Sequence, residues 1–189
     1  MTGIRYCLEK AGRRRVLSEF NPISGCDNAA RKADVVFVHG MGGDAFGTWR
    51  HGEGDANSWP HWLGEEFGEA GVWSLGYAAS ASKWGRIVSK GEPDAGHSMA
   101  LPDRALEVLD RMVQRGLGER PLLFIGHSLG GLLIKQVLRT SAEAAEERKR
   151  NVFANTRAVL FVATPHAGAG LATTLNIWKA VIGTTVTIE

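Results

Sequence analysis

The chain has 189 residues, of which 44% are hydrophobic and 22% are charged, and its formal net charge is +2. These values are close to globular averages, so they exclude a disordered chain and predict a single domain with a full core. The small net charge and the scattered basic residues exclude a partner that is bound mainly through charge, so we expect no nucleic-acid binding.

Sequence features also predict the compartment of the protein. No run of residues approaches the roughly 18 consecutive apolar residues that span a membrane. The N-terminal sequence MTGIRYCLEKAGRRR lacks the apolar stretch of a signal peptide. The two cysteines, Cys7 and Cys26, are too few to indicate a disulfide framework, and we expect free thiols. We therefore expect a soluble, cytoplasmic protein without a transmembrane segment.

The first half of the chain predicts strands and one helix. Residues 3–20 are compatible with one or two edge strands. The apolar, β-branched run at 34–39 predicts a strand that is buried on both faces of a parallel sheet. Ser58 is a suitable N-cap for an amphipathic helix that ends at Gly71, and residues 72–77 then predict the next strand.

The second half alternates helices and strands after a Gly- and Ser-rich loop at 78–97. On the first helix, Arg104 and Glu107 are expected on the solvent-exposed face. The alternation predicts a three-layer α/β/α sandwich with a mostly parallel sheet and with its site at the carboxyl ends of the strands. The predicted elements are a helix at 101–113, a strand at 122–125 with a helix running to about 148, a strand at 157–163 that is buried, and a helix at 171–182.

Residues 121–135 read PLLFIGHSLGGLLIK, an apolar run followed by a turn and then by apolar residues at helical spacing. Ser128 lies in the turn, between Gly126 and Gly130. A strand, a sharp turn with a serine, and a helix are the context of a nucleophile elbow. A serine hydroxyl becomes a good nucleophile only beside a general base that an acid orients. The pattern predicts Ser128 as a catalytic nucleophile.

A second motif, His39-Gly40-Met41-Gly42-Gly43-Asp44, directly follows the first buried strand. Attack on an ester carbonyl places negative charge on oxygen, and backbone N–H donors stabilise that charge by a few kcal/mol. The expected oxyanion donors are the N–H of Met41 and the N–H of Leu129, which follows the nucleophile. His39 is expected to brace the loop rather than to act as a base.

Three segments, VVFVHGMGGD, GHSLGGLL and FVATPHAG, together resemble the α/β-hydrolase fold. More narrowly, they are similar to the serine esterase and lipase branch that includes serine-active-site-containing proteins and GPI inositol-deacylase-like domains. The resemblance covers about residues 34–170. It implies hydrolysis of a small-molecule or lipid ester through an acyl-serine intermediate, without a metal or organic cofactor. It also implies that further domains can occur in the parent protein.

The catalytic acid and histidine are harder to find. No aspartate follows Ser128, and the histidine that follows it is His166, in a turn that is commonly structural. The resemblance implies two further strands beyond Glu189 that carry the acid and the histidine. We therefore expect residues 1–189 to be the N-terminal portion of one hydrolase domain that is poorly active alone, with His166 as a secondary candidate base.

Two alternatives stay open. The chain could be a non-catalytic relative that serves as a binding or effector module of a larger protein. It could instead use a triad rebuilt from upstream residues, although each of these is also explained by a structural role. The upstream candidates are Asp44, Asp94, His61 and His97.

Overall fold

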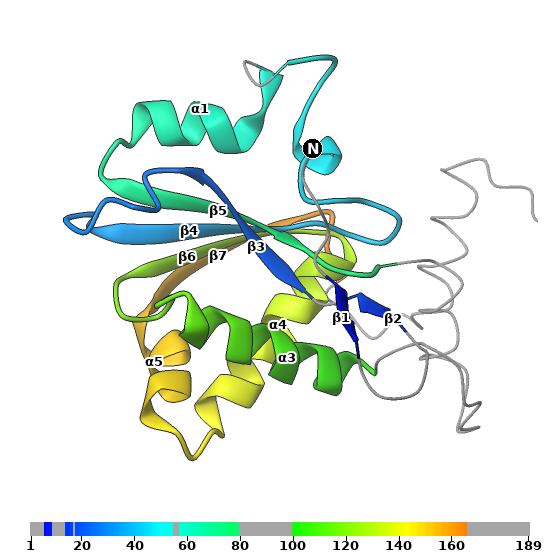
Figure 1. The fold of residues 1–189 in the computed structure, drawn as a ribbon, viewed down its shortest axis with the longest axis vertical. Coiled ribbons are helices and arrows are strands. Elements are labelled where there is room, and N and C mark those ends of the chain that lie inside the picture. The colour runs from blue at the N-terminus through cyan, green and yellow to red at the C-terminus, as the bar shows by residue number, and fades with distance from the viewer. Residues whose placement is uncertain (1–5, 9–13, 17, 55–56, 80–99, 166–189) are drawn as a thin grey trace, which may run out of the picture.

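A five-stranded sheet forms the centre of the computed structural model, which describes residues 6–8, 14–16, 18–54, 57–79 and 100–165 (Figure 1). The strand order is β3-β5-β4-β6-β7; β3 runs antiparallel to β5, and the other neighbouring pairs are parallel. This mostly parallel sheet confirms the predicted fold class. The strands are β3 (Glu19–Ser24), β4 (Ala33–Val38), β5 (Ala70–Gly76), β6 (Leu122–His127) and β7 (Thr156–Val162).

Helices cover both faces of this sheet (Figure 1). One face carries α1, and the other carries α3, α4 and α5. Right-handed crossovers explain the division, because the steps from β4 to β5 and from β5 to β6 run in opposite directions across the sheet. The helices are α1 (Trp59–Glu66), α3 (Leu101–Gln114), α4 (Leu129–Ala142) and α5 (Glu147–Asn155), with a short 3₁₀ helix η1 (Gly47–Trp49) before α1.

The N-terminal residues form a separate antiparallel pair, β1 (Tyr6–Leu8) with β2 (Arg14–Val16). The two expected strands are therefore present, but in the described residues they pair with each other rather than with an edge of the five-stranded sheet. Sequence analysis did not separate β3 from them. This strand carries Pro22, next to a register shift in its pairing with β5, and a proline is tolerated at an edge or irregular position of a sheet.

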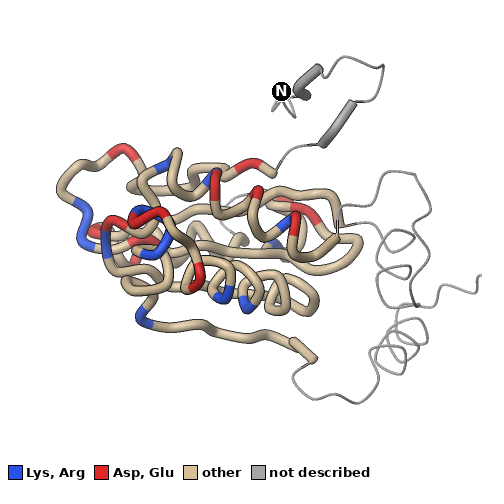
Figure 2. The backbone as a smooth tube through the Cα atoms, turned by 90° about the horizontal axis from the view of Figure 1, so that it is seen from below, with Lys and Arg blue, Asp and Glu red and all other residues tan. Residues whose placement is uncertain are grey.

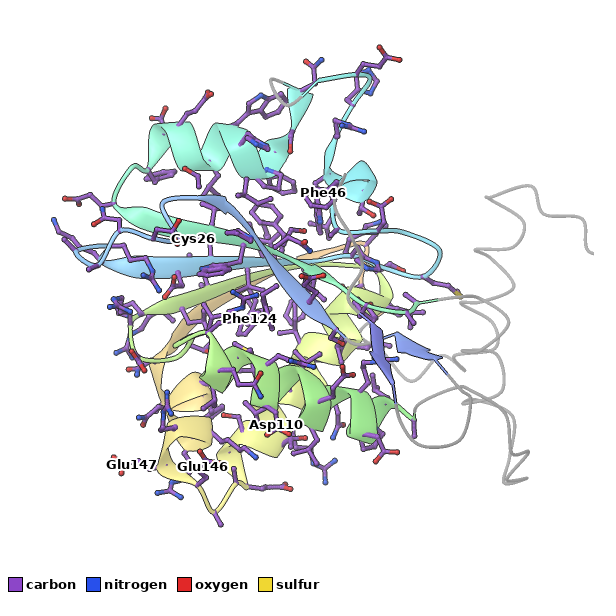
Figure 3. The ribbon with its side chains drawn as sticks, in the orientation of Figure 1. Cys26, Phe46, Asp110, Phe124, Glu146 and Glu147 are labelled. Carbon is purple, nitrogen blue, oxygen red and sulfur yellow. The ribbon has the colours of Figure 1, made fainter. Side chains whose placement is uncertain are left out.

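Strand β4 explains how the core is divided. Alternate side chains point to opposite faces, so Val36 and Val38 join the cluster under α3 and α4, whereas Val35 and Phe37 join the cluster on the α1 face. Phe124 of β6 lies on the α3 and α4 side (Figure 3). The prediction of a strand buried on both faces is confirmed.

The helix that was predicted to continue to about residue 148 ends at Ala142, and α5 begins after a short turn. The run AEAAEERKR contains good helix formers, so local propensity favours continuation. Ser141 stabilises the corner instead: its hydroxyl donates to the carbonyl oxygen of Lys149 (2.5 Å) and accepts the N–H of Phe153 (2.8 Å).

The helix that was predicted to end at Gly71 ends at Glu66, and Gly71 belongs to β5. A Cβ at this position would lie 2.6 Å from Asp34 Oδ1 and 2.7 Å from Arg31 Cδ. Gly71 is therefore required by the close approach of a buried ion pair rather than by a helix terminus.

The strand predicted at 157–163 is present as β7, but the prediction that it is buried is wrong. Within the described part of the sheet, β7 pairs only with β6, and Leu160 is 50% exposed. Its apolar composition suits a strand with neighbours on both sides, and one-dimensional patterns do not reveal how many neighbours a strand has.

Arg104 also differs from its prediction, because it is buried rather than on the solvent face of α3. Its Nη1 donates to Glu107 Oε2 (2.6 Å) and to Ser18 Oγ (3.3 Å), and the Ser18 N–H donates to Glu107 Oε1 (2.6 Å). This polar network attaches the chain that enters β3 to α3.

Charged residues of both signs are interspersed along the described backbone (Figure 2). On the outer side of α3 and α5, Lys149 Nζ lies 2.6 Å from Asp110 Oδ1 and 3.6 Å from Glu146 Oε2 (Figure 3). Such partly exposed pairs contribute little to stability. Among the helices that the structure describes, none has the length and hydrophobicity needed to cross a bilayer.

Candidate active site

Ser128 occupies the single-residue junction between β6 and α4. Its backbone has φ 53° and ψ −122°, a conformation that non-glycine residues rarely adopt and that costs of order 1–3 kcal/mol. The Ser128 N–H donates to the carbonyl oxygen of Val162 in β7 (2.8 Å), and the residue is 5% exposed. Neighbouring elements therefore hold a strained serine at the carboxyl ends of parallel strands.

Three glycines around Ser128 allow this turn to pack closely. A Cβ at Gly126 would lie 2.8 Å from the Cα of Gly131. A Cβ at Gly130 would overlap the carbonyl oxygens of Val38 and His39, at the end of β4. The first turn of α4 thus rests directly on the backbone that leads into the loop after β4.

We expect Gly130→Ala to lower the free energy of unfolding by about 3 kcal/mol, because the added methyl group meets rigid backbone atoms. Urea denaturation followed by circular dichroism measures this change. Gly68→Ala is the matched control, since a Cβ at Gly68, in the turn after α1, meets nothing within 4 Å. Equal stability of the two variants would contradict the close approach.

The loop after β4 passes alongside Ser128. A Cβ at Gly40 would lie 2.8 Å from the Cβ of Ser128. The Gly42 N–H donates to the carbonyl oxygen of Ala79 (2.7 Å), and the Gly43 N–H donates to that of Gly40 (3.3 Å).

The two amides predicted as oxyanion donors belong to this loop and to the start of α4. Met41 is half-buried and packs against the main core, whereas Leu129 is buried as the first residue of α4. Within the described part of the chain, neither the Met41 N–H nor the Leu129 N–H donates a hydrogen bond. Both amides are thus available to a ligand as far as the described residues are concerned.

His39 braces the loop, as predicted. Its Nδ1 lies 2.8 Å from the carbonyl oxygen of Gly40, and its Nε2 accepts the N–H of Tyr77 (3.4 Å). The Tyr77 hydroxyl donates to the carbonyl oxygen of His39 (2.7 Å), and the two rings stack at 4.4 Å. Burial lowers the pKa of His39. Sequence analysis gave Tyr77 no role beyond its place at the end of the strand predicted at 72–77.

Asp44, one of the upstream candidates for a rebuilt triad, organises the same loop. Its Oδ1 accepts the N–H groups of Phe46 and Gly47, both at 2.8 Å. Partial burial alone would raise the pKa of Asp44, but these two hydrogen bonds and the nearby His39 and Arg50 together outweigh it, so the pKa lies below its ordinary value. The Asp44 carboxylate therefore serves as a hydrogen-bond acceptor at the start of η1.

No described histidine is hydrogen-bonded to the hydroxyl of Ser128, and His61 lies on α1, which packs on β3 and β5. His97, Asp94 and His166 lie outside the described residues. Thr164, two residues before His166, is buried against the elbow. Its hydroxyl donates to the carbonyl oxygen of Gly126 (3.4 Å), and its side chain would meet a Cβ at Gly131.

The aromatic residues near the loop belong mainly to the core. Trp49 and Trp59 pack edge-on against Phe37, with ring centroids 5.0 and 5.7 Å away. Phe46, in contrast, is 39% exposed beside η1 (Figure 3). Among the described residues, no group of three His, Cys, Asp or Glu side chains could hold a metal ion.

Comparison with known proteins gives a family model and several relatives that this chain resembles. A family model described as "Putative serine esterase (DUF676)" matches residues 99–184. Protein SERAC1 of Bos taurus is 33% identical over 156 residues, and Protein SERAC1 of Danio rerio is 33% identical over 160 residues. The matches cover 75% and 77% of this chain but 23% of each relative. The chain thus spans about a quarter of the length of these relatives.

Solved esterase structures give more distant matches. An inhibited esterase B from Lactobacillus rhamnosis matches 89% of this chain and 58% of its own chain, with 14% identity and a TM-score of 0.40. Esterase 2 of Thermogutta terrifontis, phosphonylated by cyclosarin, matches 87% of this chain and 57% of its own, with 16% identity and a TM-score of 0.40. The family model and the curated relatives, together with the sheet and its elbow, support an α/β-hydrolase, serine-esterase-like family for this chain.

Proposed function

We propose that the protein is a carboxylic-ester hydrolase that works through an acyl-serine intermediate on Ser128. The observation that carries this proposal is the strained, buried serine between β6 and α4, with Gly40 of the preceding loop against its Cβ. Strain of this kind persists only where the surrounding structure enforces it, and it is concentrated at functional sites.

In the proposed reaction, Ser128 Oγ attacks the ester carbonyl and a histidine accepts its proton. The C–O bond to the alcohol then breaks, and the same histidine returns the proton to the leaving alcohol. Water, deprotonated by the histidine, then attacks the acyl-serine. The bond between the acyl carbon and Ser128 Oγ breaks, the histidine returns the proton to Oγ, and the carboxylic acid is released. Each step needs a general base and an oxyanion site.

The proposed oxyanion donors are the N–H groups of Met41 and Leu129. The Leu129 N–H is in the first turn of α4, where the helix dipole favours negative charge. In such sites one donor contributes about 3–4 kcal/mol to the stability of the transition state. The availability of both amides within the described residues supports this assignment.

The proposed base lies outside the described residues. His39 is unsuitable, because Gly40 and Tyr77 occupy both of its ring nitrogens. His166 is a candidate within this chain, and the contact of Thr164 with the elbow supports it. A histidine and an acid elsewhere in the complete natural protein are the other source. The match to a model of putative serine esterases supports a small-molecule or lipid ester as the proposed substrate.

Reaction with a fluorophosphonate probe tests the nucleophile. We expect the complete natural protein to be labelled at Ser128, as identified by mass spectrometry of its peptides, and we expect Ser128→Ala to abolish labelling. Ser24→Ala is a matched control, because Ser24 pairs with Val72 at the opposite end of the sheet. A folded natural protein that is not labelled would instead support the alternative, a non-catalytic binding or effector module.

A further inference from the structure

We propose that His39 and Tyr77 are positioning residues that hold the Met41 amide in the orientation required of an oxyanion donor. This inference rests on the proposed function. The inference extends the proposed function to two side chains that touch neither substrate nor Ser128 in the proposed reaction.

The geometry of one peptide group carries the argument. The carbonyl of Gly40 and the N–H of Met41 belong to the same planar peptide and point in opposite directions. The Gly40 carbonyl oxygen is held by His39 Nδ1 (2.8 Å) and by the N–H of Gly43 (3.3 Å). Fixing this carbonyl therefore fixes the direction of the Met41 N–H, in a loop that is otherwise rich in glycine.

The partners of His39 require one form of its ring. A carbonyl oxygen can only accept, so Nδ1 must carry the hydrogen, and the N–H of Tyr77 can only donate, so Nε2 must carry a lone pair. Only the neutral Nδ1–H tautomer satisfies both. Burial and the nearby His127 lower the pKa of His39, while the bond to Gly40 and the charge of Asp44 raise it, and burial is the largest of these effects.

Tyr77 connects this loop to the rest of the site. Its hydroxyl donates to the carbonyl oxygen of His39, and that oxygen would meet a Cβ at Gly130 in the first turn of α4. Gly40 in turn lies against Ser128. Through His39, Tyr77 is thus linked both to the loop after β4 and to the first turn of α4.

Two substitutions at His39 each remove one of the two hydrogen bonds of its ring, so they distinguish the contribution of each bond to catalysis. In His39→Asn, the side-chain amide can keep a donor near the Nδ1 position but loses the acceptor for the Tyr77 N–H. In His39→Gln, the side chain can keep an acceptor near the Nε2 position but loses the donor to Gly40. We expect kcat for ester hydrolysis to fall about 10²-fold in His39→Gln and about tenfold or less in His39→Asn, with KM unchanged.

Tyr77→Phe keeps the ring stack and removes the hydroxyl, and we expect an intermediate fall in kcat. His51→Gln is the matched control, because His51 is exposed, and it should keep the activity of the natural protein. Rates are divided by the folded fraction from urea denaturation. A purely structural role would leave kcat per folded molecule unchanged in all variants, and that result would overturn the proposal.

A readout without turnover distinguishes this proposal from the proposed function. Nitrogen-15 NMR of the imidazole rings should show His39 of the natural protein as the neutral Nδ1–H tautomer near neutral pH. An Nε2–H tautomer or a charged ring would overturn the positioning role, even if Ser128 is labelled by fluorophosphonate. Absence of labelling, with the expected tautomer present, would overturn the proposed function and with it the catalytic purpose of the brace.

Discussion

Replacing Ser128 by alanine should lower ester turnover by the complete natural protein by about 10⁴- to 10⁶-fold. Removal of the nucleophile eliminates the acyl-enzyme path, and only the acceleration that comes from substrate binding and the oxyanion site is left. Hydrolysis of p-nitrophenyl butyrate, measured as kcat and KM, provides the test. KM should change little, because the hydroxyl acts in the transition state rather than in binding of the ground state.

The control for this result is stability. Alanine keeps a Cβ in the strained backbone at this position, so Ser128→Ala should unfold at nearly the same urea concentration as the natural protein. Ser128→Gly should be equally inactive and at least as stable, since glycine adopts positive φ without the steric cost. A folded Ser128→Ala protein that hydrolyses the ester at the natural rate would show that the nucleophile is another residue.

Removing the N–H of Met41 should lower kcat by about 10²- to 10³-fold, the usual effect of losing one oxyanion donor. Met41→Pro removes this N–H, whereas Met41→Leu keeps it and also keeps an apolar side chain in contact with the core. We therefore expect nearly full activity from Met41→Leu. The measurement is kcat for p-nitrophenyl butyrate, with folding verified by circular dichroism.

Proline also restricts the preceding residue to extended conformations, and Gly40 is that residue. A sharper variant replaces the Met41 amide by a backbone ester, which exchanges N–H for oxygen and leaves every side chain in place. Full activity of the folded ester variant would exclude Met41 as a donor. Loss of activity in the proline variant alone would assign its effect to a distorted loop.

Much of the fold was predictable because its signals are local. The two-sided apolarity of β4 follows directly from the residues at 34–39, and the junction at Ser128 follows from a strand pattern, two glycines and a helix pattern. The predictions that were wrong depend on distant partners. Arg104 is buried because Glu107 balances its charge and Ser18 accepts a hydrogen bond from it, and no pattern within α3 indicates Ser18.

The corner at Ser141 shows the same limit on a smaller scale. Its hydroxyl bonds to Lys149 and Phe153, which follow it in the chain by 8 and 12 residues. Local propensity favours one continuous helix over this run, and the two hydrogen bonds form only when the chain turns back toward β7. The exposure of Leu160 likewise depends on β7 having one neighbour among the described strands.

The amino-acid sequence by itself determined strands β4 to β7 and the candidate nucleophile Ser128, because short patterns of apolar residues and glycines specify them, and the resemblance of its motifs indicated the family. Only the tertiary structure decided that Tyr77 belongs with the loop after β4. Strands β4 and β5 are parallel neighbours, so their carboxyl ends bring Tyr77 to His39 across a separation of 38 residues. A contact of that kind is created by sheet pairing, and no local pattern in the chain encodes it.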